Sequence, residues 1–136
     1  MARSGMAERD PAAAGRRGED QATGRLTAAG WRILGRNVRI GRAELDIVAV
    51  DPGPPPELVI VEVRFRSRRD FGLAEETVSW QKRRVLRAAL ARCLAAGRLP
   101  DGTSLPRLAA RLDLIVVEPP ALSTGPPRMR HHRAAL

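Results

Sequence analysis

The chain is short of several residue types, and each shortage narrows what the protein can be. Its 136 residues include one cysteine, so no disulfide forms within the chain and a reducing cytoplasm is the expected location. No run of about 18 apolar residues and no apolar signal segment occur, so we expect neither a membrane span nor a membrane partner. Two Trp, two Phe and no Tyr are too few for a base-stacking platform of the kind that binds single strands.

Lysine is nearly absent, because 23 of the 24 basic residues are arginine. The formal net charge is +9, but the two ends of the chain supply five of these charges. Such an arginine bias, with abundant Ala, Gly and Pro, is typical of genome base composition, so net charge alone says little about partners. The distribution of charge is more informative, since basic residues gather after Glu62 and at the start of the next helical segment: Arg64, Arg66, Arg68, Arg69, Lys82, Arg83, Arg84 and Arg87.

The length and pattern predict one α/β domain with loose ends. Residues 1–15 are rich in Ala, Gly and Arg, and residues 119–136 hold four prolines and three arginines, so both are predicted to be flexible tails. Residues 16–118 form the predicted domain, in the order helix, three strands, helix, strand. The helices are expected at about 16–29 and 79–97, and the strands at about 31–40, 43–50, 58–65 and 111–118.

A predicted hairpin carries two acidic residues inside otherwise apolar strands. A symmetric turn about Pro54 pairs positions whose numbers sum to 108, which places Asp46 opposite Glu62. The other face, which includes Leu45 and Ile47, is wholly apolar and is expected to be core. Two opposed carboxylates repel each other unless a cation or a proton lies between them.

The residues leave two explanations of this pair open. A divalent metal ion is one suitable cation, because Mg²⁺ is usually held by one or two carboxylates plus waters and substrate phosphate. Alternatively, a register slipped by two would place Asp46 opposite Arg64 and form an ordinary cross-strand ion pair.

Two further charged residues project toward the core side of the predicted helices. Glu19 shares a helical stripe with Ala22, Leu26 and Ala29, although a first-turn glutamate is also favoured by the helix dipole alone. Lys82 lies one turn before the apolar stripe of the second helix and should project toward the sheet. As the only lysine of the chain, it hints at a position that needs an ammonium group. In the last strand, Asp113 is expected to pair with an arginine, and the adjacent His131 and His132 receive no role.

Seven segments, in this order, carry a resemblance to a known family. They resemble the YraN-type family of small bacterial proteins, itself similar to the restriction-endonuclease superfamily that is named for its PD-(D/E)xK motif. The resemblance covers residues 16–118 and implies a restriction-endonuclease-like core, with a mixed sheet flanked by helices. The segments are Gly18-Glu19, Gly30-Trp31-Arg-Ile-Leu-Gly-Arg-Asn37, Glu44-Leu-Asp-Ile-Val-Ala-Val-Asp51, Leu58-Val-Ile-Val-Glu-Val-Arg64, Phe71-Gly72, Lys82 and Arg111-Leu-Asp-Leu-Ile-Val116.

The resemblance also implies a nuclease site that depends on Mg²⁺ or Mn²⁺. In it Asp46 and Glu62 would be metal ligands, and Glu19 an additional acidic member. The position of the motif lysine is Arg64 here, which stays protonated and cannot act as a general base, although it can stabilise phosphoryl charge. Lys82 is a candidate for the missing ammonium. The expected contacts to nucleic acid come from Arg66, Arg68, Arg69 and Arg83.

Three functions remain open from the sequence. The first is a metal-dependent phosphodiesterase acting on nucleic acid, and the second is a nucleic-acid-binding module without turnover. The third is a structural domain whose charged face forms ion pairs and meets a protein partner. The shortage of aromatics favours duplex or branched DNA over single strands. Neither the choice between DNA and RNA nor the oligomeric state follows from the sequence.

Overall fold

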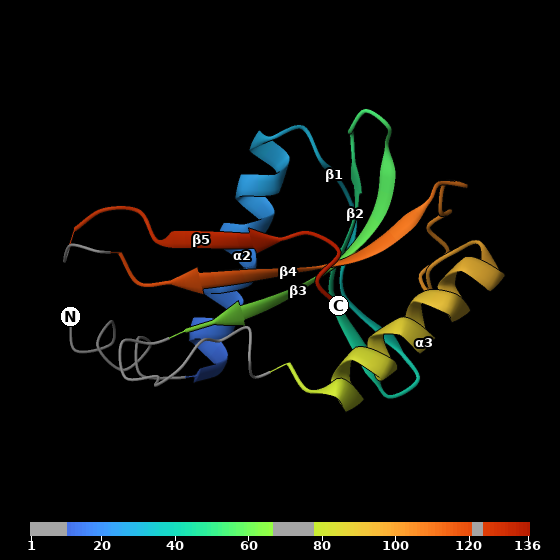
Figure 1. The fold of residues 1–136 in the computed structure, drawn as a ribbon, viewed down its shortest axis with the longest axis horizontal. Helices are drawn as coiled ribbons and strands as arrows, with labels where there is room; N and C mark the ends of the chain where they lie inside the picture. Colours follow the sequence, from blue (N-terminus) through green and yellow to red (C-terminus); the bar gives the residue numbers. More distant parts are fainter. Residues whose placement is uncertain (1–10, 67–77, 121–123) are drawn as a thin grey trace.

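The protein folds as an α/β domain built on a single mixed sheet. The computed structural model describes residues 11–66, 78–120 and 124–136, and the account below concerns these residues. Five strands lie side by side in the order β1-β2-β3-β4-β5 (Figure 1). The elements are α2 (Pro11–Ala28), β1 (Arg32–Ile40), β2 (Ala43–Asp51), β3 (Glu57–Phe65), α3 (Trp80–Ala96), β4 (Ala110–Glu118) and β5 (Arg128–His132).

The sheet combines antiparallel and parallel pairing. Strands β1, β2 and β3 form an antiparallel meander, β3 and β4 pair in parallel, and β5 returns antiparallel to β4. Helix α3 lies in the connection between the two parallel strands, as a parallel pair requires. The mixed sheet flanked by helices agrees with the predicted restriction-endonuclease-like core.

Each helix covers a different face of the sheet (Figure 1). Ala22 and Leu26 of α2 pack on one face, and Leu86, Ala89 and Cys93 of α3 belong to the cluster on the other. Alternate residues of β3 supply the two faces, as strand geometry requires: Val59 and Val61 toward α2, and Leu58 and Ile60 on the α3 side. No helix in the described part of the chain is both long and apolar enough to cross a membrane.

The predicted ends of α3 are confirmed by its capping geometry. The Ser79 side chain accepts a hydrogen bond from the backbone N–H of Lys82 at 3.1 Å, as an N-cap does. Gly97 ends the helix at φ 70°, in the left-handed region that favours glycine. This capping fixes the phase of the helix and therefore the direction of Lys82.

The predicted hairpin register is confirmed, and the slipped register is wrong. Five pairs, from Ile47 opposite Val61 to Asp51 opposite Glu57, follow the sum of 108. Pairing between β2 and β3 stops at Ile47, so the two strands separate at Asp46. The prediction that Leu45 and Ile47 share one face is wrong, because Leu45 packs in the cluster on the α3 side and Ile47 in the other. Because β2 has left β3 there, its first residues follow β1 instead of the alternation set by β3.

The prediction that residues 119–136 form a flexible tail is also wrong. Residues 128–132 form β5, which pairs with β4 from Glu118 opposite Arg128 to Leu114 opposite His132. Leu136 is buried in the cluster on the α3 side, and Met129 packs against the cluster under α2. Proline and arginine dominate the composition here and conceal a strand of only five residues. At the other end α2 begins at Pro11 instead of residue 16, and residues 1–10 lie outside the described part.

Candidate functional site

The separation of β2 from β3 creates the setting for the acidic pair. Where ladder pairing has ended, the backbone N–H of Val63 donates to Asp46 Oδ2 at 2.8 Å. The aspartate thus replaces a strand partner and lies against β3, beside Glu62. Both carboxylates are held by backbone geometry, Asp46 through this bond and Glu62 through its parallel pairing with Leu114 of β4.

Glu62 is a buried acid bordered by two cations. Its side chain is only 6% exposed. Oε1 lies 3.5 Å from Arg64 Nε and 3.8 Å from Lys82 Nζ, distances at which the charges attract without a tight hydrogen bond. Oε2 is buried and has no hydrogen-bond partner in the described structure. An orphaned carboxylate oxygen of this kind is costly unless a ligand or a proton satisfies it.

The two carboxyl groups perturb each other. Burial and the nearby Asp46 charge raise the pKa of Glu62 to about 7. Burial also raises the pKa of Asp46, although the bond from Val63 opposes the rise. The pair therefore keeps a proton to a higher pH than isolated carboxyl groups do, as carboxylates sharing a site do. A divalent cation could replace that proton.

The residues present fit a divalent metal held by two carboxylates. Asp46 and Glu62 offer hard oxygen ligands, and Oε2 of Glu62, which has no hydrogen-bond partner in the described structure, is an oxygen that a metal ion can bind. Mg²⁺ needs no more protein ligands than this when waters and a substrate phosphate complete its shell. The described residues contain no group of three or more acidic, histidine or cysteine side chains placed to hold a metal ion.

Glu19 lies near the pair without joining it in such a group. Burial and then the charge of Asp46 raise the pKa of Glu19, which places its carboxylate within electrostatic reach of the pair. Its nearer contacts are a side-chain hydrogen bond with Asn37 and Arg36 Nη2 at 3.9 Å. A role for Glu19 at the metal stays a prediction.

The other predicted site residues divide into three groups. Arg64 and Lys82 border Glu62, so the structure brings both cations to the pair. Arg66 directly follows the end of β3, with Nη1 3.9 Å from Glu118, and Arg83 is exposed on α3. Arg68 and Arg69 lie outside the described residues, as do Phe71 and Gly72 of the family motif.

A pH dependence of stability follows from the raised pKa of Glu62. Because its folded pKa of about 7 exceeds the ordinary 4.5, folding favours the protonated form. This stabilisation is fully present below pH 4.5 and is lost as the pH rises to about 7. In chelator, denaturant unfolding should give a free energy of unfolding that falls by about 3 kcal/mol over this range.

The Glu62→Gln variant is the control for this dependence. Glutamine has nearly the same shape and does not titrate, so its unfolding free energy should be nearly level between pH 5 and 8. An equal slope in the variant and the parent would assign the dependence to another group.

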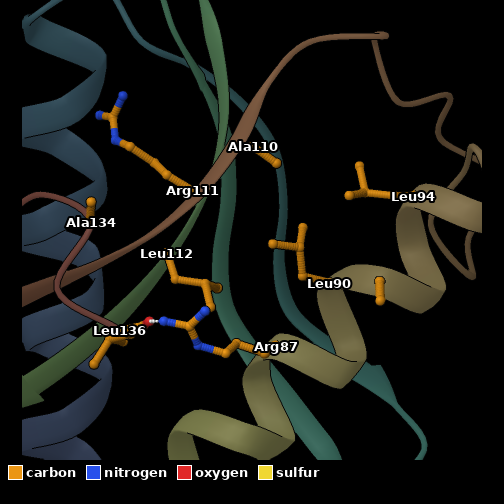
Figure 2. A pocket seen from close by; sticks show the side chains of 9 residues that line it. Arg87, Leu90, Leu94, Ala110, Arg111, Leu112, Ala134 and Leu136 are labelled. Carbon is orange, nitrogen blue, oxygen red and sulfur yellow. Dashed lines mark hydrogen bonds between the residues drawn. The ribbon is translucent and has the colours of Figure 1, made fainter.

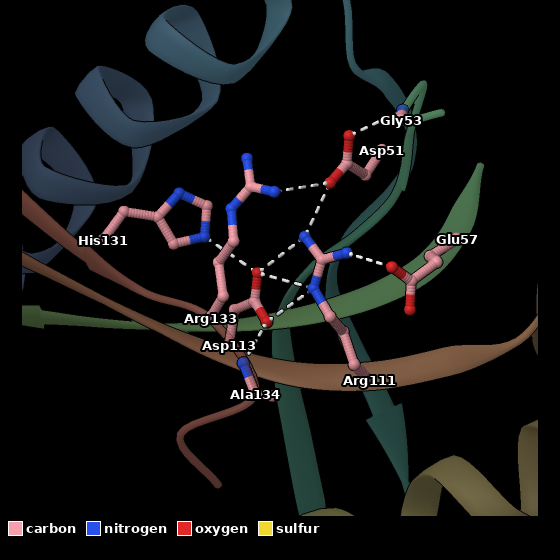
Figure 3. A network of polar contacts seen from close by, with 8 residues as sticks. All are labelled: Asp51, Gly53, Glu57, Arg111, Asp113, His131, Arg133 and Ala134. Carbon is pink, nitrogen blue, oxygen red and sulfur yellow. Dashed lines mark hydrogen bonds and ion pairs between the residues drawn. The ribbon is translucent and has the colours of Figure 1, made fainter. Parts of the chain in front are cut away.

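A second polar network was missed in the sequence apart from its central acid (Figure 3). Asp113 is fully buried, and Arg111 Nε donates to it at 3.0 Å, which confirms the predicted arginine partner. The same guanidinium donates to Asp51 at 2.7 Å and to Glu57 at 2.9 Å. His131 Nε2 lies 2.8 Å from Asp113 Oδ2. Arg111 and Asp113, two apart in one strand, share a face, and this spacing was the available signal.

A pocket of about 400 Å³ lies apart from the acidic pair, between α3 and β4 (Figure 2). Leu90 and Leu94 line one side, and Ala110 and Leu112 line the other. Arg87 closes one end, where its guanidinium donates to the backbone oxygen of Leu136. None of the described residues that line this pocket is acidic.

Comparisons with known proteins point to one group of relatives. The model of "Uncharacterised protein family UPF0102" matches residues 18–117. A UPF0102 protein of Frankia casuarinae is 42% identical over 123 residues, 90% of this chain and 95% of the relative. One of Frankia alni is 40% identical over 130 residues, 96% of this chain and 99% of the relative. One of Symbiobacterium thermophilum is 43% identical over 105 residues, 77% and 81% of the two chains.

Proposed function

Because the chain belongs to the uncharacterised protein family UPF0102, a name that states no activity, we propose its function from the site: it is a nucleic-acid-binding, metal-dependent phosphodiesterase. The membership confirms the YraN-type, restriction-endonuclease-like resemblance of the sequence. The reaction proposed is hydrolysis of a phosphodiester bond in duplex or branched DNA.

One observation carries this proposal. Two carboxylates from adjacent strands meet where those strands separate, and Glu62 Oε2 is buried without a hydrogen-bond partner in the described structure. Lys82 and Arg64 approach only Oε1 of Glu62, so the neighbouring cations do not satisfy Oε2. An arrangement that keeps one oxygen unsatisfied supports a ligand role for the pair.

Asp46 and Glu62 would hold the ion, and Mg²⁺ or Mn²⁺ suits their oxygen ligands. A metal bound there supplies a low-pKa water and charge stabilisation at the scissile phosphate. The hydrogen bond from Val63 fixes the Asp46 carboxylate, so the ligand needs little reorganisation on binding.

Lys82 takes the role of the motif lysine in this proposal. Its ammonium lies 3.8 Å from Glu62 Oε1 and its side chain is 34% exposed, so it borders both the pair and solvent. A compact ammonium can orient an attacking water and stabilise phosphoryl charge. Arg64, at 3.5 Å from the same oxygen, adds a permanent charge that binds a phosphate oxygen.

The lysine assignment predicts the effect of two substitutions. Lys82→Ala should lower metal-dependent cleavage about 100- to 1000-fold, the usual cost of losing one positioned charge. Arg64→Lys should keep or raise cleavage, since it restores the motif ammonium. Cleavage of a labelled duplex and of a branched junction with Mg²⁺ or Mn²⁺ is the measurement, and Arg98→Ala, an exposed arginine beyond α3, is the control. An unchanged rate in Lys82→Ala would refute the assignment.

A binding module without turnover is the second candidate, favoured by arginine at the position of the motif lysine. It differs from the first candidate in one measurable respect. If the protein is a binding module, the Asp46→Asn variant binds DNA as tightly as the parent does. Neither protein then shows cleavage that depends on Asp46 at any metal concentration.

A further inference from the structure

A smaller cavity lies under the last turn of α2, on the opposite side of the sheet from α3. Its volume is about 170 Å³. Leu26, Trp31 and Met129 form its apolar floor, and Arg25, His131 and Arg133 contribute its basic groups. Among the described residues, none that lines the cavity is acidic, and none belongs to the acidic pair or to the cations beside it.

The floor of the cavity is held rigidly. Trp31 is only 6% exposed and lies between two cationic or polar groups. The His131 ring is 5.6 Å from the Trp31 ring, and the Arg111 guanidinium is 5.5 Å from it. The fully buried Asp113 holds both of these neighbours through hydrogen bonds. The residues of the floor are therefore held in place before any ligand arrives.

The rim of the cavity can bind an anion in addition to Asp51, which already pairs with Arg133. Arg133 is 64% exposed, and its Nη1 lies 3.5 Å from Asp51, a loose pair that leaves other donors free. Figure 3 draws His131 and Arg133 beside the Asp113 carboxylate that fixes the imidazole. Arg25 alone is explained by its place in the last helical turn, where positive charge is favoured. That explanation does not cover Arg133 and His131, which come from another part of the chain.

We infer that this cavity binds a nucleoside monophosphate unit, either free or as the phosphorylated end of a nucleic-acid strand. Its volume is below the ~300–1,000 Å³ of pockets for drug-sized ligands, so it takes one small ring. The apolar floor suits the ring of a base, and the arginines at the rim suit a phosphate. Only the strand-end form rests on the proposed function, because a free nucleotide needs no cleavage at Asp46 and Glu62.

Tryptophan fluorescence tests the inference directly. The chain has two tryptophans, and Trp80 is 68% exposed on α3, so Trp80→Phe leaves Trp31 as the sole reporter. Uridine 5′-monophosphate, whose base is a single ring, should change the emission saturably, and uridine or inorganic phosphate should bind about tenfold more weakly. No saturable change up to about 10 mM nucleotide would overturn the inference, as would inorganic phosphate binding equally well.

Charge variants in the Trp80→Phe background locate the site. Arg25→Gln with Arg133→Gln should weaken nucleotide binding at least about tenfold. Arg98→Gln with Arg107→Gln removes the same charge from exposed loop positions and should leave it unchanged. An equal loss in both double variants would reduce the effect to net charge and contradict the inference.

Competition identifies the source of the nucleotide. If a 5′-phosphorylated oligonucleotide displaces the bound mononucleotide and its 5′-hydroxyl form does not, the cavity is assigned to strand ends. If neither oligonucleotide displaces it, the cavity is assigned to free nucleotides. Both results uphold the site, whereas equal displacement by the two oligonucleotides would contradict a phosphate site. Loss of cleavage on substituting Asp46 bears on the proposed function only, so the two claims fail separately.

Discussion

Metal-dependent cleavage should fall at least about 100- to 1000-fold when Asp46 is changed to Asn or Glu62 to Gln. Each change keeps the shape of the side chain and removes one negative ligand from a two-carboxylate site, so the remaining acid holds the ion weakly. Hydrolysis of a labelled duplex at the Mn²⁺ concentration that half-saturates the parent is the measurement. Rising Mn²⁺ should restore part of the rate, because the lesion lies in ion binding.

Glu44→Gln is the matched control for this loss. Glu44 lies on the same strand, two residues before Asp46, and pairs with Arg39 at 3.6 Å on the surface. Its substitution makes the same change of charge and should alter the rate less than about twofold, as exposed pairs contribute little. Equal losses in Glu44→Gln and Asp46→Asn would indicate a general effect of charge and remove the reason for assigning ligands.

The largest loss of stability is expected from Arg111→Met, at about 3–5 kcal/mol in the free energy of unfolding. The guanidinium contacts Asp51, Glu57 and Asp113, and the last of these is fully buried. Burial by itself raises the pKa of Asp113, but hydrogen bonds from His131, Arg111 and the Ala134 N–H outweigh it and lower the value. Removing the arginine leaves buried negative charges with fewer partners.

The pH dependence of this variant gives a second measurement. In the parent, the lowered pKa values of Asp51 and Asp113 add stability that is present above pH 3.8 and is lost as the pH falls below it. The difference in free energy of unfolding between the parent and Arg111→Met should therefore become smaller below this pH, as measured by urea unfolding. Arg98→Met, at an exposed position, should stay within about 0.5 kcal/mol of the parent. A deficit below about 1 kcal/mol for Arg111→Met would mean that the network contributes little.

The hairpin could be predicted from the sequence because its determinants are local. The turn about Pro54 sets the register, and period-two alternation then places Asp46 and Glu62 together. Lys82 could be predicted for a similar reason, since the Ser79 cap and the apolar stripe fix the phase of α3.

The separation of β2 from β3 at Asp46 could not be predicted from local pattern. The separation depends on how the first residues of β2 pair with β1. This pairing decides both the position of Leu45 and the hydrogen bond from Val63 to Asp46. The burial of Glu62 Oε2 without a hydrogen-bond partner likewise depends on tertiary packing, which a local pattern does not fix.

The C-terminal strand was missed because its partner is distant in the sequence and its composition suggests a loop. Proline and arginine dominate residues 126–133, yet Met129 packs into the core and Arg128 to His132 complete the edge of the sheet. With β5 absent from the prediction, the contact of His131 with Asp113 had no basis, and the cavity under α2 could not be foreseen.

Binding of Mn²⁺ to the acidic pair tests the central claim most directly. We expect anomalous density for one ion between the carboxylates of Asp46 and Glu62 in crystals soaked with Mn²⁺. In solution, calorimetry should give saturable binding to the parent that is lost in Glu62→Gln and kept in Glu44→Gln. Density elsewhere, or equal Mn²⁺ binding by the parent and Glu62→Gln, would contradict a metal site at this pair.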